Sequence, residues 1–305
     1  MTKSMTKSLL KPMAASVSRT LRIGVRVCAA LAVLVPWAHG SPTQTTHDGL
    51  VLNANYHVPT SARERIFLVV HGTWAHSGME IVASLQGLLG ERGAASLAPT
   101  LSLGQSDRSG FLPCAPEMLA NHAAALAEID HWVGFLQRQG WRSVVIIGHS
   151  RGGAQAAWYQ ASVRNRLVEE LVLLAPMVWR ESEVAAAYDA VSKVPLAEVL
   201  KDARGSNEQR IGPYRLLGCD DVLAPPSAFL SYYGASVPKH TPAILRDVAV
   251  PVSVLLGTAD RITQWSDAER QSLAAKTNVR IIDVDGAGHF FRDLYLDDVV
   301  DQVME

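Results

Sequence analysis

Continuous apolar runs alternate with amphipathic stretches along most of this chain. A short uninterrupted apolar run is typical of a strand that is buried on both faces of a parallel sheet. The longest helical pattern covers residues 116–139, and Gly140 stops it. Strands that alternate with helices predict an α/β fold, with a mostly parallel central sheet flanked by helices. The expected strands are 50–58, 66–70, 94–99, 144–147, 171–174, 250–256 and 279–284, and the other expected helices are 78–89, 154–159, 266–275 and one from about residue 291.

Residues 177–247 interrupt this alternation. The segment is polar with a helical pattern over residues 181–201, and it then becomes rich in Gly, Pro and Tyr. The strand and helix patterns resume after it. We therefore expect one domain over residues 41–305 that carries an inserted cap at about 177–247. Residues 41–48 are expected to be a polar lead-in to the first strand.

The first forty residues have the layout of a secretory signal peptide. They contain six Lys and Arg residues and no acidic residue, then an apolar segment at 27–35 and small residues at Ala38 and Gly40. A transmembrane anchor is the competing interpretation, but the apolar run is too short and Pro36 ends it. We expect cleavage near Gly40, export to a periplasm or to the medium, and no stable membrane insertion of the mature chain.

Cleavage there removes six positive charges and lowers the formal net charge from −1 to −7. Such an acidic protein has no basic surface for nucleic acid or anionic lipid, so the expected partner is a small-molecule substrate. The oligomeric state stays open. Of the three cysteines, Cys28 leaves with the signal. Cys114 and Cys219 could form one disulfide in an oxidising compartment, or remain two isolated buried thiols.

The clearest chemical motif is Gly148-His149-Ser150-Arg151-Gly152. It follows a run of β-branched residues and precedes an Ala-rich helical stretch, which is the context that a G-x-S-x-G nucleophile elbow requires. In such an elbow, a tight strand-to-helix turn presents the Ser hydroxyl above the sheet. Side chains at Gly148 and Gly152 would clash where the strand and the helix cross. The pattern alone could arise by chance, but its context predicts that Ser150 is a nucleophile.

A serine nucleophile needs a base and an acid, and elbow enzymes carry them in the order Ser, acid, His. His289 fits this order and lies in a glycine-rich turn just after the last predicted strand. Asp260 follows the preceding strand, at the sheet edge where α/β proteins gather their site residues. Asp283 and Asp285 are rivals by proximity to His289, but they share its strand end. We therefore predict Ser150, Asp260 and His289 as the catalytic residues.

Two backbone N–H groups are needed to hold the negative charge that develops on a substrate oxygen. One is expected from Arg151, because it follows the nucleophile. The other is expected from the loop after the strand at 66–70, where Thr73 is the first choice and Trp74 the second. The alternative is that His71-Gly72 only ends the strand.

These motifs, in this order, resemble the α/β-hydrolase superfamily, in particular its capped serine esterases and lipases. The resemblance runs from about residue 50 to the C-terminus outside the insertion, and it includes residues 104–108 and 257–260. It implies an α/β-hydrolase fold, a Ser150–Asp260–His289 triad and a cap over the pocket. Residues 101–104 depart from the charged Asp-x-Arg-Gly-x-Gly stretch of many relatives. Members that attack with Asp, such as dehalogenases and epoxide hydrolases, are disfavoured because the elbow residue is Ser.

Aromatic residues in segments expected to surround the pocket are candidates for substrate binding, and ordinary packing of the cap and core is the alternative. The chain has no His-Glu-x-x-His motif, no paired cysteine spacing and no phosphate loop, so neither a metal nor a cofactor is expected. His122 and His131 fall on a predicted helix, where exposed or capping roles are expected. The aromatic candidates are Trp74, Phe111, Trp179, Phe229, Tyr232 and Tyr233.

The sequence thus predicts an exported serine hydrolase that cleaves carboxylic esters through an acyl-enzyme. The same triad also supports an amidase or peptidase, a C–C bond hydrolase or a cofactor-free perhydrolase. A catalytically silent binding protein on the same scaffold is a further alternative, although all three triad positions carry the required residue types.

Overall fold

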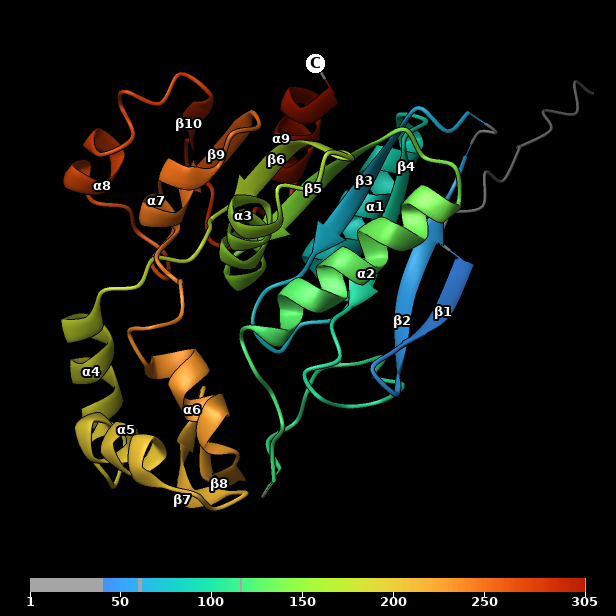
Figure 1. Ribbon diagram of the computed structural model, residues 1–305. Coiled ribbons are helices and arrows are strands. Elements are labelled where there is room, and N and C mark those ends of the chain that lie inside the picture. The colour runs from blue at the N-terminus through green and yellow to red at the C-terminus, as the bar shows by residue number, and fades with distance from the viewer. Residues whose placement is uncertain (1–40, 60–61, 116, 305) are drawn as a thin grey trace, which may run out of the picture. The chain divides into compact units, whose positions relative to one another are not determined.

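An eight-stranded sheet forms the centre of the computed structural model, which describes residues 41–59, 62–115 and 117–304. Its strands lie in the spatial order β1 (Ser41–His47), β2 (Leu50–His57), β4 (Ala95–Thr100), β3 (Arg65–Val70), β5 (Ser143–His149), β6 (Val168–Leu174), β9 (Val252–Gly257) and β10 (Val279–Val284) (Figure 1). The strands from β4 across to β10 are parallel, whereas β2 is antiparallel to both β1 and β4. The Gly-x-Ser-x-Gly motif therefore lies at the end of a central parallel strand, β5.

Helices cover both faces of the sheet because successive strand residues point in opposite directions. In β3, Leu68 belongs to the apolar core under α2 (Ala124–Arg138) and α3 (Arg151–Val163). The next residue, Val69, belongs to the core under α1 (Glu80–Glu91) and α9 (Leu294–Met304). This arrangement confirms the predicted α/β fold. The short helices are α7 (Thr241–Ile244), η1 (Leu245–Asp247) and α8 (Asp267–Gln271).

Two predictions about local structure are wrong. The expected polar lead-in is the edge strand β1, which pairs with β2 along its whole length and has every second residue partly shielded from residue 43 onward. The long helix starts at Ala124 rather than at residue 116. The segment before it pairs with the insertion instead, where the N–H of Met118 donates to the carbonyl of Leu223 at 3.0 Å. His122, expected on that helix, lies just before it and is fully buried.

The expected signal peptide lies outside the described residues. The description begins at Ser41, the first residue of β1. Within the described part of the chain, no helix is both long enough and apolar enough to cross a lipid bilayer.

Between β6 and β9, the chain from α4 to α6 forms a separate layer, which we call the cap. It contains α4 (Glu181–Asp189), α5 (Leu196–Gly205), the hairpin of β7 (Ile211–Leu216) and β8 (Cys219–Ala224), and α6 (Pro226–Tyr233). The cap has its own apolar core, in which Phe229 and Val222 are fully buried. Figure 1 shows the cap gathered at one end of the sheet, the end at which β6 leads into it.

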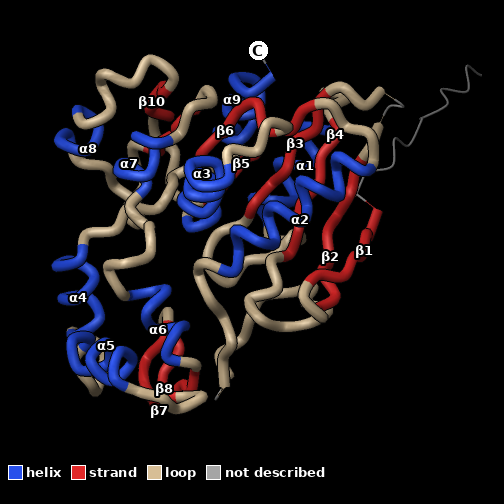
Figure 2. The backbone as a smooth tube through the Cα atoms, viewed as in Figure 1, coloured by secondary structure: helices blue, strands red, loops and turns tan. Residues whose placement is uncertain are grey.

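The loop between β4 and α2 crosses to the cap and is fastened there (Figure 2). Cys114 of this loop forms a disulfide with Cys219, the first residue of β8. The structure thus contains the disulfide that the sequence left open. A second attachment comes from the loop after β3, where Nε1 of Trp74 donates to the carbonyl of Leu217 at 3.0 Å. The core therefore holds the cap at points remote from the cap's own two chain connections.

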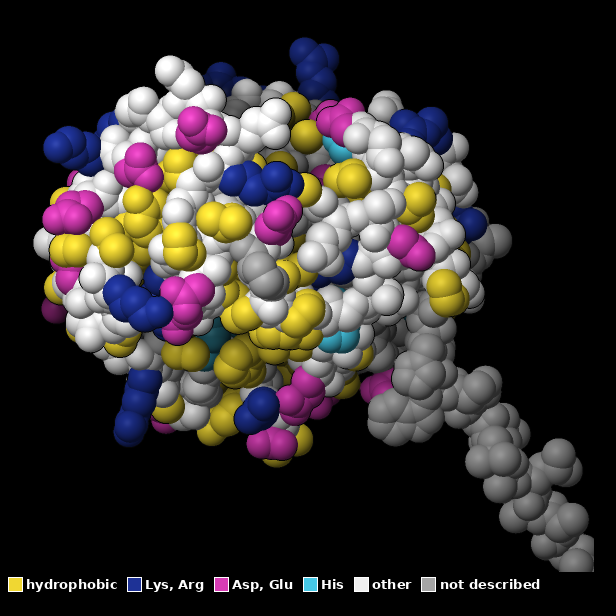
Figure 3. Space-filling model, turned by 90° about the horizontal axis from the view of Figure 1, so that it is seen from below, with side chains coloured by type: hydrophobic (Ala, Val, Ile, Leu, Met, Phe, Trp, Pro, Cys, Tyr) yellow, Lys and Arg dark blue, Asp and Glu magenta, His cyan; other side chains and the backbone are white. Residues whose placement is uncertain are grey.

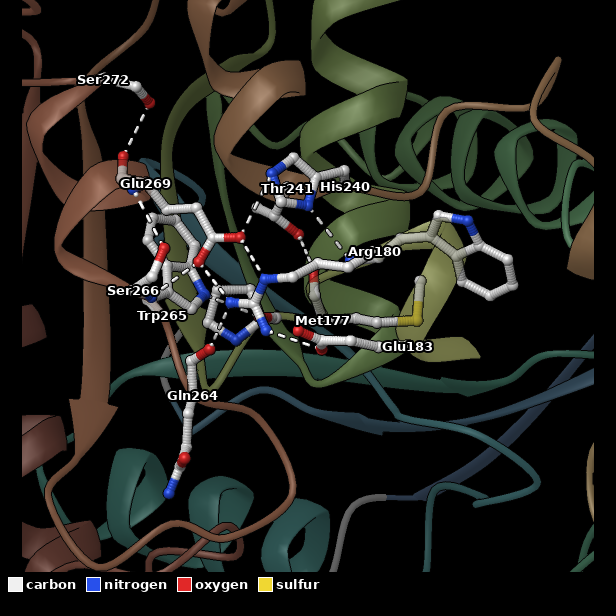
Figure 4. Close-up of polar contacts among 12 residues, drawn as sticks. Met177, Arg180, Glu183, His240, Thr241, Gln264, Trp265, Ser266, Glu269 and Ser272 are labelled. Atoms are coloured by element: carbon white, nitrogen blue, oxygen red, sulfur yellow. Dashed lines mark hydrogen bonds and ion pairs between the residues drawn. The ribbon is translucent and has the colours of Figure 1, made fainter. Parts of the chain in front are cut away.

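Those two chain connections meet the core in a network of polar contacts (Figure 4). Arg180, just before α4, pairs with Glu269 of α8 and with Glu183. Thr241, on the segment that returns from the cap, donates its hydroxyl to the carbonyl of Met177 on the outgoing segment. The outgoing and returning segments are therefore joined to each other and to the core.

We expect the disulfide to stabilise the fold, because Cys114 and Cys219 are 105 residues apart in the sequence. Closing so long a loop restricts the unfolded chain, so replacing both cysteines with serine should lower the free energy of unfolding by about 2–5 kcal/mol. Urea denaturation measures the change. The wild-type protein under reducing conditions should show the same loss, and the double variant should not respond to the reductant. Equal stability of the oxidised wild type and the variant would contradict this expectation.

Candidate active site

Ser150 lies at a sharp turn between β5 and α3. Its backbone has φ 54° and ψ −119°, which residues other than glycine rarely adopt. Two backbone bonds hold the turn: the N–H of Ser150 donates to the carbonyl of Leu174 at 2.9 Å, and its carbonyl accepts the N–H of Met177 at 3.0 Å. The serine side chain remains partly exposed. The serine of the sequence motif thus lies on a strained strand-to-helix turn, as a nucleophile elbow requires.

Close backbone contacts explain the two glycines that flank the serine motif. A Cβ on Gly152 would lie 2.5 Å from the carbonyl oxygen of Val70, and one on Gly148 would lie 2.7 Å from Cα of Gly153. Any side chain at these positions would push α3 away from β3 or β5. The predicted reason for both glycines is confirmed.

His289 and Asp260 form a buried hydrogen-bonded pair. Nδ1 of His289 donates to Oδ2 of Asp260 at 2.8 Å, which leaves Nε2 for a reacting group. The other carboxylate oxygen accepts the N–H groups of Ile262 at 2.7 Å and Thr263 at 3.0 Å. Burial raises the pKa of Asp260, but the bonds from His289 and the two N–H groups outweigh it and hold the pKa below its ordinary value. The carboxylate is therefore ionised and positioned to orient the imidazole.

The two rival carboxylates have other partners. Asp283 forms an ion pair with Arg270 at 2.7 Å, and Asp285 accepts the hydroxyl of Thr258 at 3.0 Å. Both side chains are exposed. The structure thus brings Asp260, and neither rival, into contact with the imidazole.

His149, which precedes the serine, holds the loop that carries His289. Its Nε2 donates to the carbonyl of His289 at 2.9 Å, and the two rings lie 4.9 Å apart. Burial, followed by the neighbouring His289 ring, lowers the pKa of His149 to about 4, so this ring is neutral. The bond ties the loop after β10 to the residue that precedes Ser150. The elbow motif accepts any residue at this position, so the sequence offered no signal for the role.

The loop after β3 approaches Ser150 closely, and hydrogen bonds of His71 fix the conformation of this loop. A Cβ on Gly72 would lie 3.2 Å from Cβ of Ser150. Nδ1 of His71 donates to the carbonyl of Gly72 at 2.8 Å, and Nε2 accepts the N–H of Leu101 at 2.9 Å. Burial lowers the pKa of His71 to about 3, which keeps the ring neutral as this bonding pattern requires. His71 is therefore more than the end of a strand.

Thr73 and Arg151 each offer a backbone N–H beside the serine. Arg151 is the first residue of α3, and the opening N–H groups of a helix have no acceptor within it. Within the described ranges, no carbonyl or side chain accepts the N–H of Thr73. Both groups are therefore suited to hold a developing oxyanion.

Arg108 anchors the same loop from the side of β4. Its guanidinium donates to the carbonyls of Trp74, Ala75 and Leu101 at 2.7, 2.5 and 2.6 Å. Burial lowers its pKa to about 10, so it stays charged at neutral pH. The sequence motif around Arg108 was recognised, but this bridging role depends on three carbonyls that only the fold brings together.

A sequence model of the Alpha/beta hydrolase family matches residues 67–303. The chain belongs to this family. A comparison of the hydrolase with curated proteins finds no match.

Solved structures share the fold over most of the hydrolase. Est1E from Butyrivibrio proteoclasticus with bound ferulic acid has a TM-score of 0.62 at 16% identity, over 86% of this chain and 98% of its own. An esterase from Pyrococcus furiosus has a TM-score of 0.57 at 13% identity, over 88% and 89%. An alpha-beta serine hydrolase homologue from Coxiella burnetii has a TM-score of 0.53 at 13% identity, over 87% and 96%. At these identities, the likeness establishes the fold alone.

Two of the aromatic candidates lie next to the site of the hydrolase. The rings of Trp74 and Tyr232 are 6.4 Å apart. Trp74 follows Thr73 in the loop beside the serine, and the Arg151 guanidinium lies 5.1 Å from the centre of the Tyr232 ring. Both side chains are buried, so they shape the surroundings of the serine from behind rather than offer an exposed surface.

The other aromatic candidates lie further away. Phe229 is fully buried and packs edge-on against Tyr214 in the core of the cap, so we do not assign it to substrate contact. Phe111 is 61% exposed. The rings of Trp179 and Tyr233 lie 6.3 Å apart where the cap joins the core. On the cap side of the hydrolase, hydrophobic side chains gather between charged ones (Figure 3).

Metal-ligating side chains do not cluster in the ranges 41–59, 62–115 and 117–304. No group of three or more His, Cys, Asp or Glu residues there is arranged to hold an ion. The buried histidines described above have other partners, since His71 and His149 bond backbone carbonyls and His289 bonds Asp260.

The Asp260 carboxylate should make a pH-dependent contribution to stability. Because its pKa is lower in the folded state, the ionised form stabilises the fold above the ordinary pKa of 3.8, and the contribution is lost as the pH falls through the lower, folded-state value. The difference in free energy of unfolding between the wild type and Asp260→Asn should therefore shrink between about pH 5 and pH 3. Chemical denaturation at several pH values measures it. The exposed Asp285→Asn serves as the control, and a difference for Asp260→Asn that does not change with pH would contradict the expectation.

Proposed function

We propose that the hydrolase is an exported serine enzyme that cleaves carboxylic esters through an acyl-enzyme, with Ser150, His289 and Asp260 as its catalytic residues. The observation that supports the proposal is the strained turn at Ser150, to which two groups are connected. One is the loop at Gly72, which passes against the serine. The other is the His289–Asp260 pair, which His149 ties to the elbow.

In the first half of the reaction, Nε2 of His289 takes the proton of the Ser150 hydroxyl while Oγ attacks the ester carbonyl carbon. Asp260 keeps the imidazole oriented and stabilises the imidazolium that forms. The N–H groups of Thr73 and Arg151 receive the oxyanion, and each such donor is typically worth roughly 3–4 kcal/mol of transition-state stabilisation. The imidazolium then gives its proton to the departing alcohol, which leaves an acylated serine.

Water completes the cycle through the same groups. His289 removes a proton from a water molecule as that water attacks the acyl carbonyl, and the oxyanion forms again between the two N–H groups. Collapse of this intermediate returns the proton to Ser150 Oγ and releases the carboxylic acid. The start of α3 also directs the positive end of its helix dipole toward the site, which favours both negatively charged intermediates.

Two observations support the export of the enzyme. Residues 1–40 combine a basic segment, a short apolar segment and small residues before Ser41, as secretory signal peptides do. The Cys114–Cys219 disulfide is of the kind that persists in oxidising compartments outside the cytosol.

The ester bond is proposed as the substrate class because two of the similar structures point to it. One is described as an esterase, and Est1E has bound ferulic acid, a carboxylic acid. Amides, C–C bonds and peroxide remain alternatives for the same three residues, and a substrate panel compares them directly.

Ser150→Ala should abolish ester hydrolysis and labelling by a fluorophosphonate probe, because it removes the only atom that attacks the substrate. The probe is applied to residues 41–305, and peptide mapping locates the label. Ser162→Ala, an exposed serine of α3, is the matched control and should behave as the wild type. Full activity of Ser150→Ala, or the absence of label on a folded wild-type protein, would overturn the assignment.

Arg108→Met should lower kcat by about tenfold to a hundredfold with little change in KM, because the loop that carries the Thr73 N–H loses its anchor. Arg108→Lys keeps the charge but lacks the planar fork that reaches three carbonyls, so it should restore only part of the loss. Steady-state kinetics measures both, and circular dichroism shows that the variants fold. A folded Arg108→Met enzyme with wild-type kcat would contradict the role.

A further inference from the structure

Two cations, the half-buried Arg151 and the buried Lys239, lie near the candidate active site without a carboxylate partner. Arg151 follows the nucleophile at the start of α3, and Lys239 lies on the segment that returns from the cap. Among the residues that the structure describes, no Asp or Glu oxygen lies within 4.0 Å of either charged group. Charges removed from water without a counter-ion are costly, so their presence calls for an explanation.

The Arg151 side chain lies between the core and the cap. Its Nε donates to Oγ1 of Thr73 at 2.9 Å, and the guanidinium lies over the Tyr232 ring of α6. NH1 makes only a long contact of 3.5 Å with Nδ1 of His122. The outer edge of the guanidinium, formed by NH1 and NH2, therefore keeps N–H groups for a further acceptor.

Lys239 is even less accessible, with 2% of its surface exposed. Its Nζ donates to the carbonyls of Gly234 and Val237 and lies 4.8 Å from the centre of the Trp179 ring. Two carbonyls use two of the three N–H groups of an ammonium. One N–H group of the Lys239 ammonium therefore has no hydrogen-bond acceptor in the described part of the chain, and its positive charge has no carboxylate beside it there.

The two cations belong to one cluster, which His122 joins. Nδ1 of His122 faces Arg151, and Nε2 donates to the carbonyl of Pro238, the residue before Lys239, at 3.3 Å. Burial, followed by the charges of Arg151 and Lys239, lowers the pKa of His122 well below its ordinary value, so the ring is neutral. Burial, followed by Arg151, also lowers the pKa of Lys239 to about 8, whereas the exposed Glu181 acts in the opposite direction. The electrostatic potential in this cluster is therefore positive.

Arginines elsewhere in the described chain are neutralised differently. Arg180 pairs with Glu269 at 2.5 Å, and the hydrogen bonds that it donates to that carboxylate raise the pKa of Arg180. Arg108 is buried, but three carbonyls accept from it and the charge of Glu128 acts on it. Arg151 has neither kind of compensation within the described residues, although it is the cation next to the nucleophile.

Room for a ligand lies beside Lys239. A cavity of about 560 Å³ runs between α3, the start of the cap and the returning segment. Aromatic rings and Lys239 share its wall with Arg164 and Asp247, so a ligand there would meet apolar surface, two cations and one carboxylate. Its lining includes Trp158, Trp179, Pro238, Lys239 and His240.

We propose that Arg151 and Lys239 form an anion subsite beside Ser150, which selects esters that carry a free carboxylate, such as half-esters of dicarboxylic acids. The NH1–NH2 edge of an arginine presents two parallel N–H groups, which match the two oxygens of a carboxylate. The ammonium of Lys239 adds charge at a second point. This assignment rests on the proposed serine hydrolase function, because it names the substrate class of that same site.

A matched pair of substrates tests the subsite: the mono-4-nitrophenyl ester of adipic acid and the neutral 4-nitrophenyl hexanoate. The quantity measured is the ratio of their kcat/KM values, with the background taken from Ser150→Ala. The wild type should prefer the charged ester, and Arg151→Met and Lys239→Met should each lower the ratio by about tenfold to a hundredfold. A loss of oxyanion stabilisation affects both esters equally and leaves the ratio unchanged. Arg166→Met and Lys201→Met, two exposed cations, are the matched controls.

A second measurement separates the subsite from the hydrolase function. Isothermal titration calorimetry of adipate with the wild type should show binding that Arg151→Met weakens about tenfold or more, whether or not any ester is cleaved. Ester turnover with no preference for the charged ester would overturn the subsite and leave the hydrolase standing. Adipate binding through Arg151 without ester turnover would support the subsite and overturn the proposed function. No adipate binding, or an equal loss in the control variants, would overturn the subsite.

Discussion

The site depends on how closely the turn at Ser150 presses against the end of β3. Gly152 meets the backbone of Val70 and His71, which leaves no room for a larger residue there, and Gly72 in turn lies tightly against Ser150. This contact forces the serine into its strained conformation and brings the loop with the Thr73 N–H beside it. The strain persists because β3 and β6, the neighbours of β5, are buried on both faces, and this packing prevents the turn from relaxing.

Buried histidines in this molecule have separate tasks, and their surroundings decide which. His71 and His149 bond backbone carbonyls, and burial keeps both rings neutral, so they act as fixed supports for the loops after β3 and β10. His289 alone among these three donates to a carboxylate, that of Asp260, which fixes the orientation of its ring. The same side chain is thus a support in one place and a candidate base in another.

The cap and the segment that returns from it bring side chains to the surroundings of Ser150. It is attached through the disulfide, through Trp74 and through the network at Arg180, so Tyr232 is held over the Arg151 guanidinium. Lys239 arrives on the returning segment and adds a second charge. A chain that carries a net charge of −7 after residue 40 therefore contains a positive cluster that includes Arg151, the residue after Ser150.

The sequence by itself determined the alternation of strands and helices, the elbow at Ser150 and the order in which Asp260 and His289 follow it. These features depend on residues close together in the chain, such as apolar periodicity and the glycines of a tight turn. Only the tertiary structure decided that residues before Ala124 pair with the cap, that Cys114 meets Cys219, and which carbonyls Arg108 holds. Each of these depends on partners far apart in the sequence, whose positions are set when the sheet and the cap pack together, and local pattern carries no record of such contacts.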